Sequence, residues 1–311
     1  MNQTTVTSFL LLGLENNQTI NTLLFVVILW IYILTLAANF LLIILVVTVP
    51  TLRSPMYVLF SQLSMSDILL TTNITPNLLW FLLSGGGKRH VSGCITQFFF
   101  YVLFTALECL LLTVMSFDLY VAICKPLHYG SIMNVKLCLS MSFWSWGFAF
   151  MVALVLDLLI SNLQFCGPFV IDHYFSPLLE LSYSDVTVVQ LTDVMFTIPF
   201  ILTPFCFIIF TYISIGLAIL RVSSTSGRHK AFSTCSSHLI VVCTYFGSLI
   251  TLYILSYKVH GLNMNTILSF LYTVSTPFFN PVIYSLSDNE IKAAVMKLLS
   301  NLPVMLFLPS V

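Results

Sequence analysis

Charged residues are scarce in this 311-residue chain. Lysine and arginine together number 11, as do aspartate and glutamate, so 7% of the residues are charged and the formal net charge is zero. A soluble domain carries roughly 25% charged residues. With 59% hydrophobic residues and a mean hydropathy of +1.02, the chain cannot cover itself with polar surface in water, and we expect an integral membrane protein in contact with lipid. The lack of net positive charge argues against a nucleic-acid partner.

Several chemical signatures are also missing. The sequence has no Gly-x-Ser-x-Gly, His-Glu-x-x-His or Walker motif, so we do not expect an enzyme. It has no internal repeat and no series of ionisable groups along a membrane path, which disfavours a transporter or channel. None of the eight cysteines has the Cys-x-x-Cys spacing. Cys235-Ser-Ser-His238 has a spacing that suits zinc, but two ligands do not make a site, and a packed helix end is the simpler interpretation.

Long apolar runs dominate what is present. Seven of them are near or above the ~20 residues that cross a bilayer as a helix. The period-2 alternation of a membrane barrel is absent, and short connections favour antiparallel neighbours. We therefore predict an all-α membrane protein, a seven-transmembrane-helix bundle, with spans at about Leu23–Val49, Met56–Leu83, Gln97–Val121, Leu139–Ser161, Asp193–Leu220, Ser233–Tyr257 and Thr266–Leu286.

The bundle is expected to occupy residues 23–286, between an extracellular arm (1–22) and a cytoplasmic tail (287–311). The arm lacks lysine and arginine and has no cleavable apolar core, so we expect no signal peptide. In the tail, apolar residues line one side of a helix with lysines beside them, which predicts a short amphipathic helix on the inner leaflet. These apolar residues are Ile291, Val295, Leu298 and Leu299, and the lysines are Lys292 and Lys297.

The distribution of basic residues sets the orientation. An extracellular amino terminus places eight basic residues in the inner segments and three in the outer ones, as the positive-inside rule requires. The arm then exposes two glycosylation sequons, of which Asn2 is the better acceptor and Asn17 lies close to the membrane. A third sequon, at Asn73, falls inside the second predicted span, where glycosylation cannot occur.

On this topology only Cys94 and Cys166 lie on the oxidising side. A disulfide between them would tie the long second outer loop to the top of the third helix. Two unpaired thiols are the alternative. We favour the disulfide for a protein of the secretory route.

Polar residues occur at membrane depth. An ionisable group there usually faces the interior of the bundle and has a role. Asp67, Glu108, Asn39 and Asn280 fall in four different predicted helices, and together they could hold water and a small cation such as sodium. A purely structural polar network is the alternative, and we favour a network that also binds the cation. Asp157 has no partner that the sequence identifies.

Four long motifs carry a specific resemblance. They are LRSPMYVLFSQLSMSD (52–67), DLYVAICKPLHY (118–129), KAFSTCSSHL (230–239) and PFFNPVIYSL (277–286). The seven predicted spans, Asp67, the Cys94/Cys166 pair and Asn280-Pro281-x-x-Tyr284 resemble a rhodopsin-like G-protein-coupled receptor. The four motifs resemble the odorant (olfactory) receptor family over essentially the whole chain. The resemblance implies a plasma-membrane receptor for small, mostly apolar volatile molecules that signals through a heterotrimeric stimulatory G protein to cyclic AMP, with no cofactor other than the cation.

The resemblance also implies a ligand pocket in the outer half of the bundle. The absence of an acid there in the third helix disfavours an amine, so an oxygenated apolar ligand fits better. Hydrogen bonds would come from Tyr101, Thr105, Tyr253 and Thr273. The same 3–4 residue spacing also arises from helix packing alone. The complete implied set is Tyr101, Val102, Thr105, Ala106, Phe196, Phe200, Leu249, Ile250, Tyr253, Phe270 and Thr273.

The implied coupling motif is altered in this chain. Where the family has an acid, an arginine and a tyrosine, the sequence reads Asp118-Leu119-Tyr120. A leucine offers neither a charge nor a donor to a G protein, so a receptor-shaped protein that binds without signalling is the alternative function. Tyr245-Phe246 also stands where the family usually has Phe-Tyr, which moves the hydroxyl by about 100° around the helix. The other implied switch residues are Tyr212, Lys230, His238, Asn280, Pro281 and Tyr284.

Overall fold

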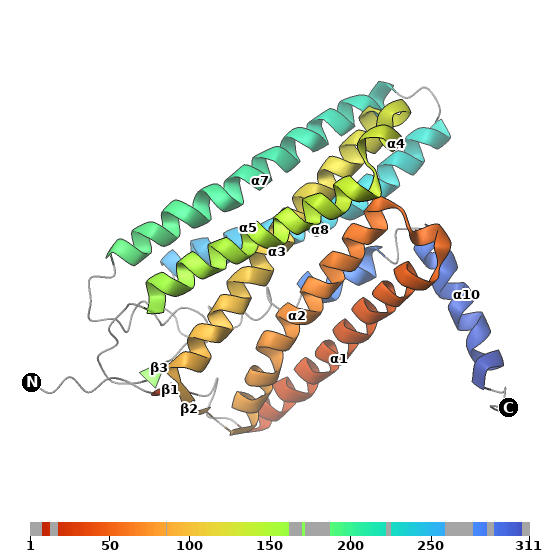
Figure 1. The fold of residues 1–311 in the computed structure, drawn as a ribbon. Helices are drawn as coiled ribbons and strands as arrows, with labels where there is room; N and C mark the ends of the chain where they lie inside the picture. The colour runs from red at the N-terminus through yellow and green to blue at the C-terminus, as the bar shows by residue number, and fades with distance from the viewer. Residues whose placement is uncertain are drawn as a thin grey trace, which may run out of the picture.

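The computed structural model describes residues 8–12, 18–84, 86–161, 170–171, 187–221, 225–258, 276–284 and 289–306. Within these residues, long helices run back and forth side by side (Figure 1). Six helices of the described part have 27 to 35 residues: α1 (Gln18–Thr48), α2 (Pro55–Ser84), α3 (Val91–Cys124), α5 (Val135–Ser161), α7 (Thr187–Arg221) and α8 (Thr225–Lys258).

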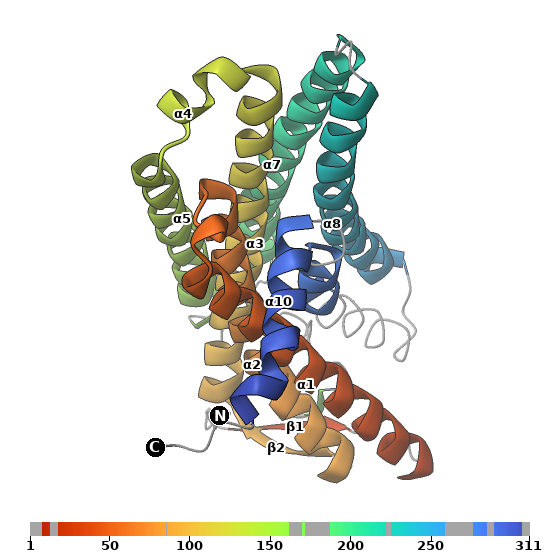
Figure 2. The ribbon, with the colours of Figure 1, turned by 90° about the vertical axis from the view of Figure 1, so that its right-hand side faces the viewer.

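Shorter helical segments complete the described part. The turns η1 (Pro50–Leu52) and η2 (Pro126–His128) follow α1 and α3, and the single turn α4 (Tyr129–Ile132) precedes α5. Residues 276–284 form a helix, and α10 (Asn289–Leu306) leaves the bundle at an angle beside α1 and η1 (Figures 1 and 2).

The observed helices match six of the seven predicted spans. Most extend beyond the apolar run that predicted them, as α3 begins six residues before Gln97. Intrahelical hydrogen bonds form in water as well as in lipid, so polar residues at the ends of a span continue the helix. Of the seventh predicted span, Thr266–Leu286, the structure describes only residues 276–284.

Four of the described helices are long and apolar enough to cross a membrane: α1, α3, α5 and the Phe200–Arg221 part of α7. Large apolar side chains cover their outer surfaces, such as Phe143 and Leu220, which are 71% and 72% exposed. A surface of this kind would be strongly unfavourable in water, so it is a surface for lipid. The expected membrane protein is confirmed. The helix α2 is more polar, but its polar residues Ser66, Asp67 and Thr71 are fully buried against other helices.

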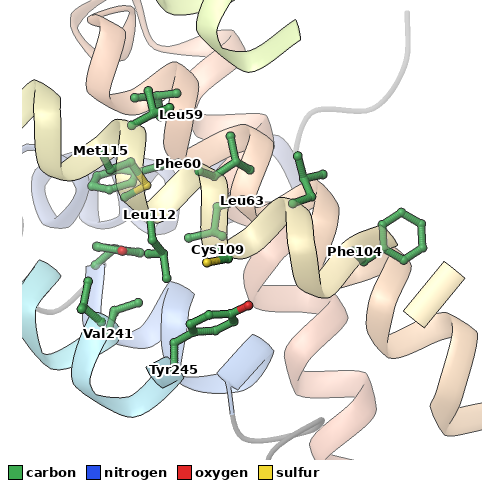
Figure 3. Packing of buried hydrophobic residues seen from close by; sticks show 14 of the residues in the cluster. Leu59, Phe60, Leu63, Phe104, Cys109, Leu112, Met115, Val241 and Tyr245 are labelled. Carbon is green, nitrogen blue, oxygen red and sulfur yellow. The ribbon is translucent and has the colours of Figure 1, made fainter. Parts of the chain in front are cut away.

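The helix α3 lies at the centre and packs against α2, α5, α7 and α8. Its buried side chains Leu107, Leu111 and Met115 belong to one continuous apolar core. Figure 3 shows part of this core, in which Leu59, Phe60 and Leu63 of α2 lie beside α3 and Val241 and Tyr245 approach α3 from α8. This core surrounds the helices that carry the buried polar residues described below.

A small sheet at one end of the bundle was not predicted. The central strand β1 (Ser8–Leu12) pairs antiparallel with β2 (Gly86–His90) and parallel with β3 (Val170–Ile171). We call this end of the bundle the sheet end and the opposite end, which carries Asp118, the Asp118 end. The three strands come from segments far apart in the sequence, and no local pattern of β1 identifies such partners. The sheet adds to the predicted helical architecture.

The apolar side of α10 packs differently from the prediction. Ile291 is buried in the main core, with Val295 and Leu298 partly buried against it, so this side contacts the bundle itself. The hydroxyl of Tyr57 donates a hydrogen bond of 3.2 Å to Glu290 Oε2 at the start of α10. The sequence had assigned these apolar residues to the membrane because an amphipathic helix shows which side is apolar but not what covers it.

Candidate functional site

Two buried acids lie at the centre of the bundle. Asp67 of α2 is fully buried and Glu108 of α3 nearly so, and the two side chains lie close enough to interact. Asn280 donates to both carboxylate oxygens of Asp67, at 3.2 and 3.1 Å. The structure thus brings together three of the four residues predicted from the sequence for a cation site.

Asn39 of α1 makes a different contact from the one expected. Its amide nitrogen donates to the carbonyl oxygens of Thr35 and Pro277, both at 3.0 Å. It therefore holds α1 to the helix of Asn280 through the backbone, and within the described residues it makes no hydrogen bond to Asp67. The expectation of four converging side chains placed Asn39 correctly in the interior but missed that its donor bonds to the backbone.

Oxygen atoms remain available near this centre. Among the described side chains, Glu108 Oε1, Asn39 Oδ1 and the Thr276 hydroxyl are buried without a hydrogen-bond partner. Carboxylate, amide and hydroxyl oxygens are the ligands that hard cations such as sodium prefer, and they also bind water. In the described part of the chain no three His, Cys, Asp or Glu side chains come together, so any cation would rest on this acid pair with neutral oxygens.

At the Asp118 end the acid is held by a tyrosine. The hydroxyl of Tyr129, in the segment between α3 and α5, donates to Asp118 Oδ1 at 2.9 Å, and Asp118 is buried. Burial and the Asp118 carboxylate raise the pKa of the Tyr129 phenol well above its usual range. Leu119, the next residue, is 5% exposed and makes apolar contacts, while Tyr120 is partly buried beside it.

A second polar group joins α7 to α8 at the same end. Tyr212 Oη lies 2.6 Å from His238 Nδ1 and also donates to the carbonyl oxygen of Cys235 at 3.3 Å. His238 is buried, and its Nε2 has no hydrogen-bond partner among the residues that the structure describes. Of the predicted switch residues, Tyr212 and His238 therefore touch each other. Lys230 lies in α8, and its side chain is outside the described part.

Tyr284 ends the helical segment 276–284. Its ring stacks on Phe60 of α2 with 4.2 Å between the ring centroids, and its hydroxyl is buried with no hydrogen-bond partner in the described ranges. Pro281 and Asn280 in the same segment are also buried. The Asn-Pro-x-x-Tyr motif thus faces the interior, where Asn280 contacts Asp67 and Tyr284 contacts the start of α2.

The structure describes some of the predicted ligand positions, and several of these belong to or pack against the core around α3. Ala106 and Leu249 are buried, and Tyr101, Val102 and Phe200 pack partly buried against the core. Ile250 is 44% exposed, on a different side of α8 from buried Leu249. The side chains of Phe196 and Tyr253 lie outside the described part, as do residues Phe270 and Thr273.

Among the described members of this group, Thr105 has a hydroxyl group whose hydrogen-bonding capacity is not used. Its hydroxyl oxygen is buried, with no hydrogen-bond partner in the described part of the chain. The carbonyl oxygen of the same residue accepts a hydrogen bond of 2.6 Å from the hydroxyl of Tyr245 in α8. Figure 3 shows Tyr245 directed from α8 toward α3. The sequence predicted that the hydroxyl of Tyr245 lies at a different position around the helix from the one usual in the family. It did not predict the partner of that hydroxyl.

Comparison with known proteins decides the family. A family model described as "Olfactory receptor" matches residues 28–302 of the chain. The chain belongs to the olfactory receptor family. Human olfactory receptor 10A7 is 40% identical over 303 residues, which cover 96% of each chain. Human olfactory receptor 10C1 is 41% identical over 301 residues (95% of this chain, 96% of the relative), and mouse olfactory receptor 6Z7 is 39% identical over 297 residues (94% and 95%).

Membership in the olfactory receptor family confirms the resemblance that the motifs predicted. Olfactory receptors are transmembrane G-protein-coupled receptors that act in sensory transduction, and they are not enzymes. The predicted Cys94/Cys166 disulfide cannot be followed, because Cys166 lies outside the described residues, as do the sequons at Asn2 and Asn17. Asn73 lies within α2, and its side-chain nitrogen donates to the carbonyl oxygen of Gln97 at 3.0 Å.

One residue at the Asp118 end was missed in the sequence. Leu127, in the turn η2 between α3 and α5, is 95% exposed. An isolated exposed leucine is unremarkable on a soluble protein, but this one stands on a short loop beyond the end of a membrane helix. In the sequence, the preceding proline, which favours a turn, was the signal that this leucine lies in a loop.

Proposed function

We propose that this chain is a seven-helix plasma-membrane receptor with an extracellular amino terminus that binds small, mostly apolar, oxygenated molecules. In this topology the sheet end is outside and the Asp118 end is inside. The observation that carries the proposal is the buried Thr105 hydroxyl, which has no hydrogen-bond partner in the described part of the chain and lies on α3, the helix that packs against α7 and α8 in one apolar core. An apolar surface with one free donor selects a ligand with an apolar body and an oxygen acceptor, such as an alcohol, aldehyde, ketone or ester.

Within the described residues, the missing hydrogen-bond partner of Thr105 and the lack of a free acid near it both bear on the class of ligand. A buried hydroxyl without a partner loses a hydrogen bond that water would otherwise supply, and a ligand oxygen restores it. A charged amine would need a buried carboxylate for compensation. The nearest acid along α3 is Glu108, which is buried beside Asp67. Neutral oxygenated ligands are therefore favoured.

Coupling to a stimulatory heterotrimeric G protein, and so to cyclic AMP, is the proposed output. A ligand that binds one state of the bundle better shifts the population toward it, and we propose that α7 and α8 separate at the Asp118 end in that state. The exposed side chain of Leu127 would offer an apolar contact to the partner on the same face. The switch residues that would rearrange are Tyr212, Lys230, His238 and Tyr284.

The alternative function concerns Leu119. If the arginine that the family usually carries here is needed for contact with the G protein, the chain binds its ligand and couples weakly or not at all. Leu119 is buried with apolar neighbours and offers no donor. The two functions share the same fold and pocket and differ only in output.

Three further features belong to the proposal. The acid pair Asp67/Glu108 with Asn280 would hold a sodium ion in one state of the receptor. A disulfide would join Cys94 to Cys166 on the outer side, and glycosylation would occur at Asn2, with Asn17 a second acceptor.

Cyclic AMP in cells that express the chain tests the function. We would compare wild type, Leu119→Arg and Leu127→Ser, which removes the proposed apolar contact with the G protein, over a panel of oxygenated and hydrocarbon odorants, with surface labelling to equalise expression. A response of the wild type to oxygenated odorants that Leu127→Ser reduces supports the receptor function. A response of Leu119→Arg alone supports the alternative. Silence of all forms at equal surface expression contradicts the proposed ligand class.

A further inference from the structure

Leu119 lies in an apolar cluster that is separate from the main core. Its buried members are Leu119 of α3, Ile215 and Ile219 of α7, and Cys235 of α8. Partly buried side chains surround them, namely Met56, Tyr120, Ile123, Cys124 and Tyr212. Side chains from three helices thus share one apolar cluster with Leu119 at the Asp118 end. Position 119 is one of the places where the sequence differs from the pattern of the family.

Hydrogen bonds reinforce the same junction. Tyr212, at the edge of the cluster, donates to the carbonyl oxygen of Cys235, itself a buried member, and contacts His238 one helical turn further along α8. Any movement of α8 away from α7 breaks these contacts together with the apolar ones. The junction therefore separates as a unit.

We propose that Leu119 is the centre of an apolar latch, made of Leu119, Ile215, Ile219 and Cys235, that holds α8 against α3 and α7 and keeps the Asp118 end closed. This inference rests on the proposed function, in which that end opens to admit a G protein. Opening the latch exposes four apolar side chains to water, which opposes the opening in proportion to the area exposed. Leu119 thus stabilises the closed state, besides lacking the donor that an arginine would offer the G protein.

Substitution by alanine separates the latch from the missing arginine. Alanine at position 119 lacks a positive charge just as leucine does, so it cannot restore a contact that requires arginine. It removes most of the apolar side chain, so it weakens the latch. Leu119→Arg does not separate the two explanations, because a guanidinium forced among apolar side chains also destabilises the closed cluster.

The thiol of Cys235 reports on the latch directly. It is buried in the closed arrangement and becomes accessible only when α8 moves away. We would treat membranes opened on the cytoplasmic side with a water-soluble maleimide and measure modification of Cys235 over time by mass spectrometry of its peptide. Leu119→Ala and, from the opposite side of the latch, Ile219→Ala should each raise the rate about tenfold over wild type.

Leu111→Ala is the matched control, because Leu111 is a buried leucine of the same helix but belongs to the main core. Its rate should stay within about twofold of wild type if the effect is local. Unchanged rates in both latch variants, or an equal rise in Leu111→Ala, would overturn the latch. If Leu119→Ala does not reach the membrane, Leu119→Val and Ile219→Ala decide the question by the same criterion.

The labelling requires neither odorant nor G protein. Faster labelling in the latch variants without any cyclic-AMP response would leave the latch standing and contradict the proposed coupling. A receptor that responds to odorant in the wild type while the latch variants label at the wild-type rate would leave the function standing and reject the latch.

Discussion

The hydroxyl of Tyr245 in α8 donates a hydrogen bond of 2.6 Å to the carbonyl oxygen of Thr105 in α3. Thr105 therefore contacts α8 through its backbone, while its own hydroxyl has no partner in the described part of the chain. A ligand held by that hydroxyl would lie next to a contact between α3 and α8, and α8 is one of the helices proposed to move when the Asp118 end opens. Phe246, the neighbour of Tyr245, is buried and packs against Phe205 of α7 at 5.1 Å between centroids.

Replacement of Tyr245 by phenylalanine should lower stability modestly. The change removes one hydrogen bond of about 1 kcal/mol net, and the Thr105 carbonyl can keep its intrahelical partner. We expect the melting temperature of the purified receptor in detergent to fall by roughly 2 °C. The variant Phe246→Leu, which leaves the hydrogen bond intact, serves for comparison. An unchanged melting temperature in Tyr245→Phe would show that the bond contributes nothing to the closed bundle.

Thr105→Val should weaken binding of oxygenated ligands selectively. Valine keeps the volume of threonine but removes the free hydroxyl, and because that hydroxyl has no partner in the described structure, the receptor itself should lose little stability. We expect the half-maximal concentration for an alcohol or ketone to rise about tenfold, the value for a hydrocarbon of the same shape to stay constant, and surface expression to be unaffected. Equal losses for both ligands would place Thr105 outside the ligand contact.

Sodium should stabilise the receptor through Asp67 and Glu108. A cation that binds only the folded bundle at about ten times its dissociation constant adds about 1.4 kcal/mol. We expect the melting temperature to rise by roughly 3 °C when sodium replaces potassium at constant ionic strength. Asp67→Asn and Glu108→Gln should each abolish the difference between the two salts.

Asp157 provides the control for sodium. It is another carboxylate of a membrane helix, in α5, outside the acid pair. The sodium effect should persist in Asp157→Asn. Its persistence in Asp67→Asn would instead assign the acid pair to a purely structural network.

Cys94 and Cys166 should behave as one unit. If they form a disulfide, Cys94→Ser and Cys166→Ser should reduce surface expression equally, and the double variant should be no worse than either single one. Cys206→Ser, at an exposed position of α7, should have no effect. Additive losses in the double variant, or alkylation of both thiols without prior reduction, would contradict the disulfide.

The positions of the helices and the acid pair were predictable from the sequence because each rests on a local property. An apolar run long enough to cross a bilayer forms a helix wherever it lies, since the backbone has no other way to satisfy its hydrogen bonds in lipid. The cost of an acid at membrane depth likewise predicted that Asp67 and Glu108 face the interior. Both residues are buried side by side.

Partners across the fold were not predictable in this way. Asn39 bonds to the Pro277 carbonyl, 238 residues away, and Tyr245 to the Thr105 carbonyl, 140 residues away. Which atom a side chain meets at such a separation depends on how each helix is rotated and where it crosses its neighbours, and small differences in packing decide this. The strand β1 likewise needed two loops from elsewhere in the chain to form a sheet.

Leu119 shows most clearly what the sequence determines and what the tertiary structure adds. The sequence alone determined that the usual arginine is missing, and hence that a charge and a donor are lost. Only the tertiary structure placed Ile215, Ile219 and Cys235 around the leucine and gave it a contact of its own. The physical reason is that the composition of a segment and the spacing of its apolar residues can be read from that segment alone. The burial of a side chain depends on the other segments that pack against it.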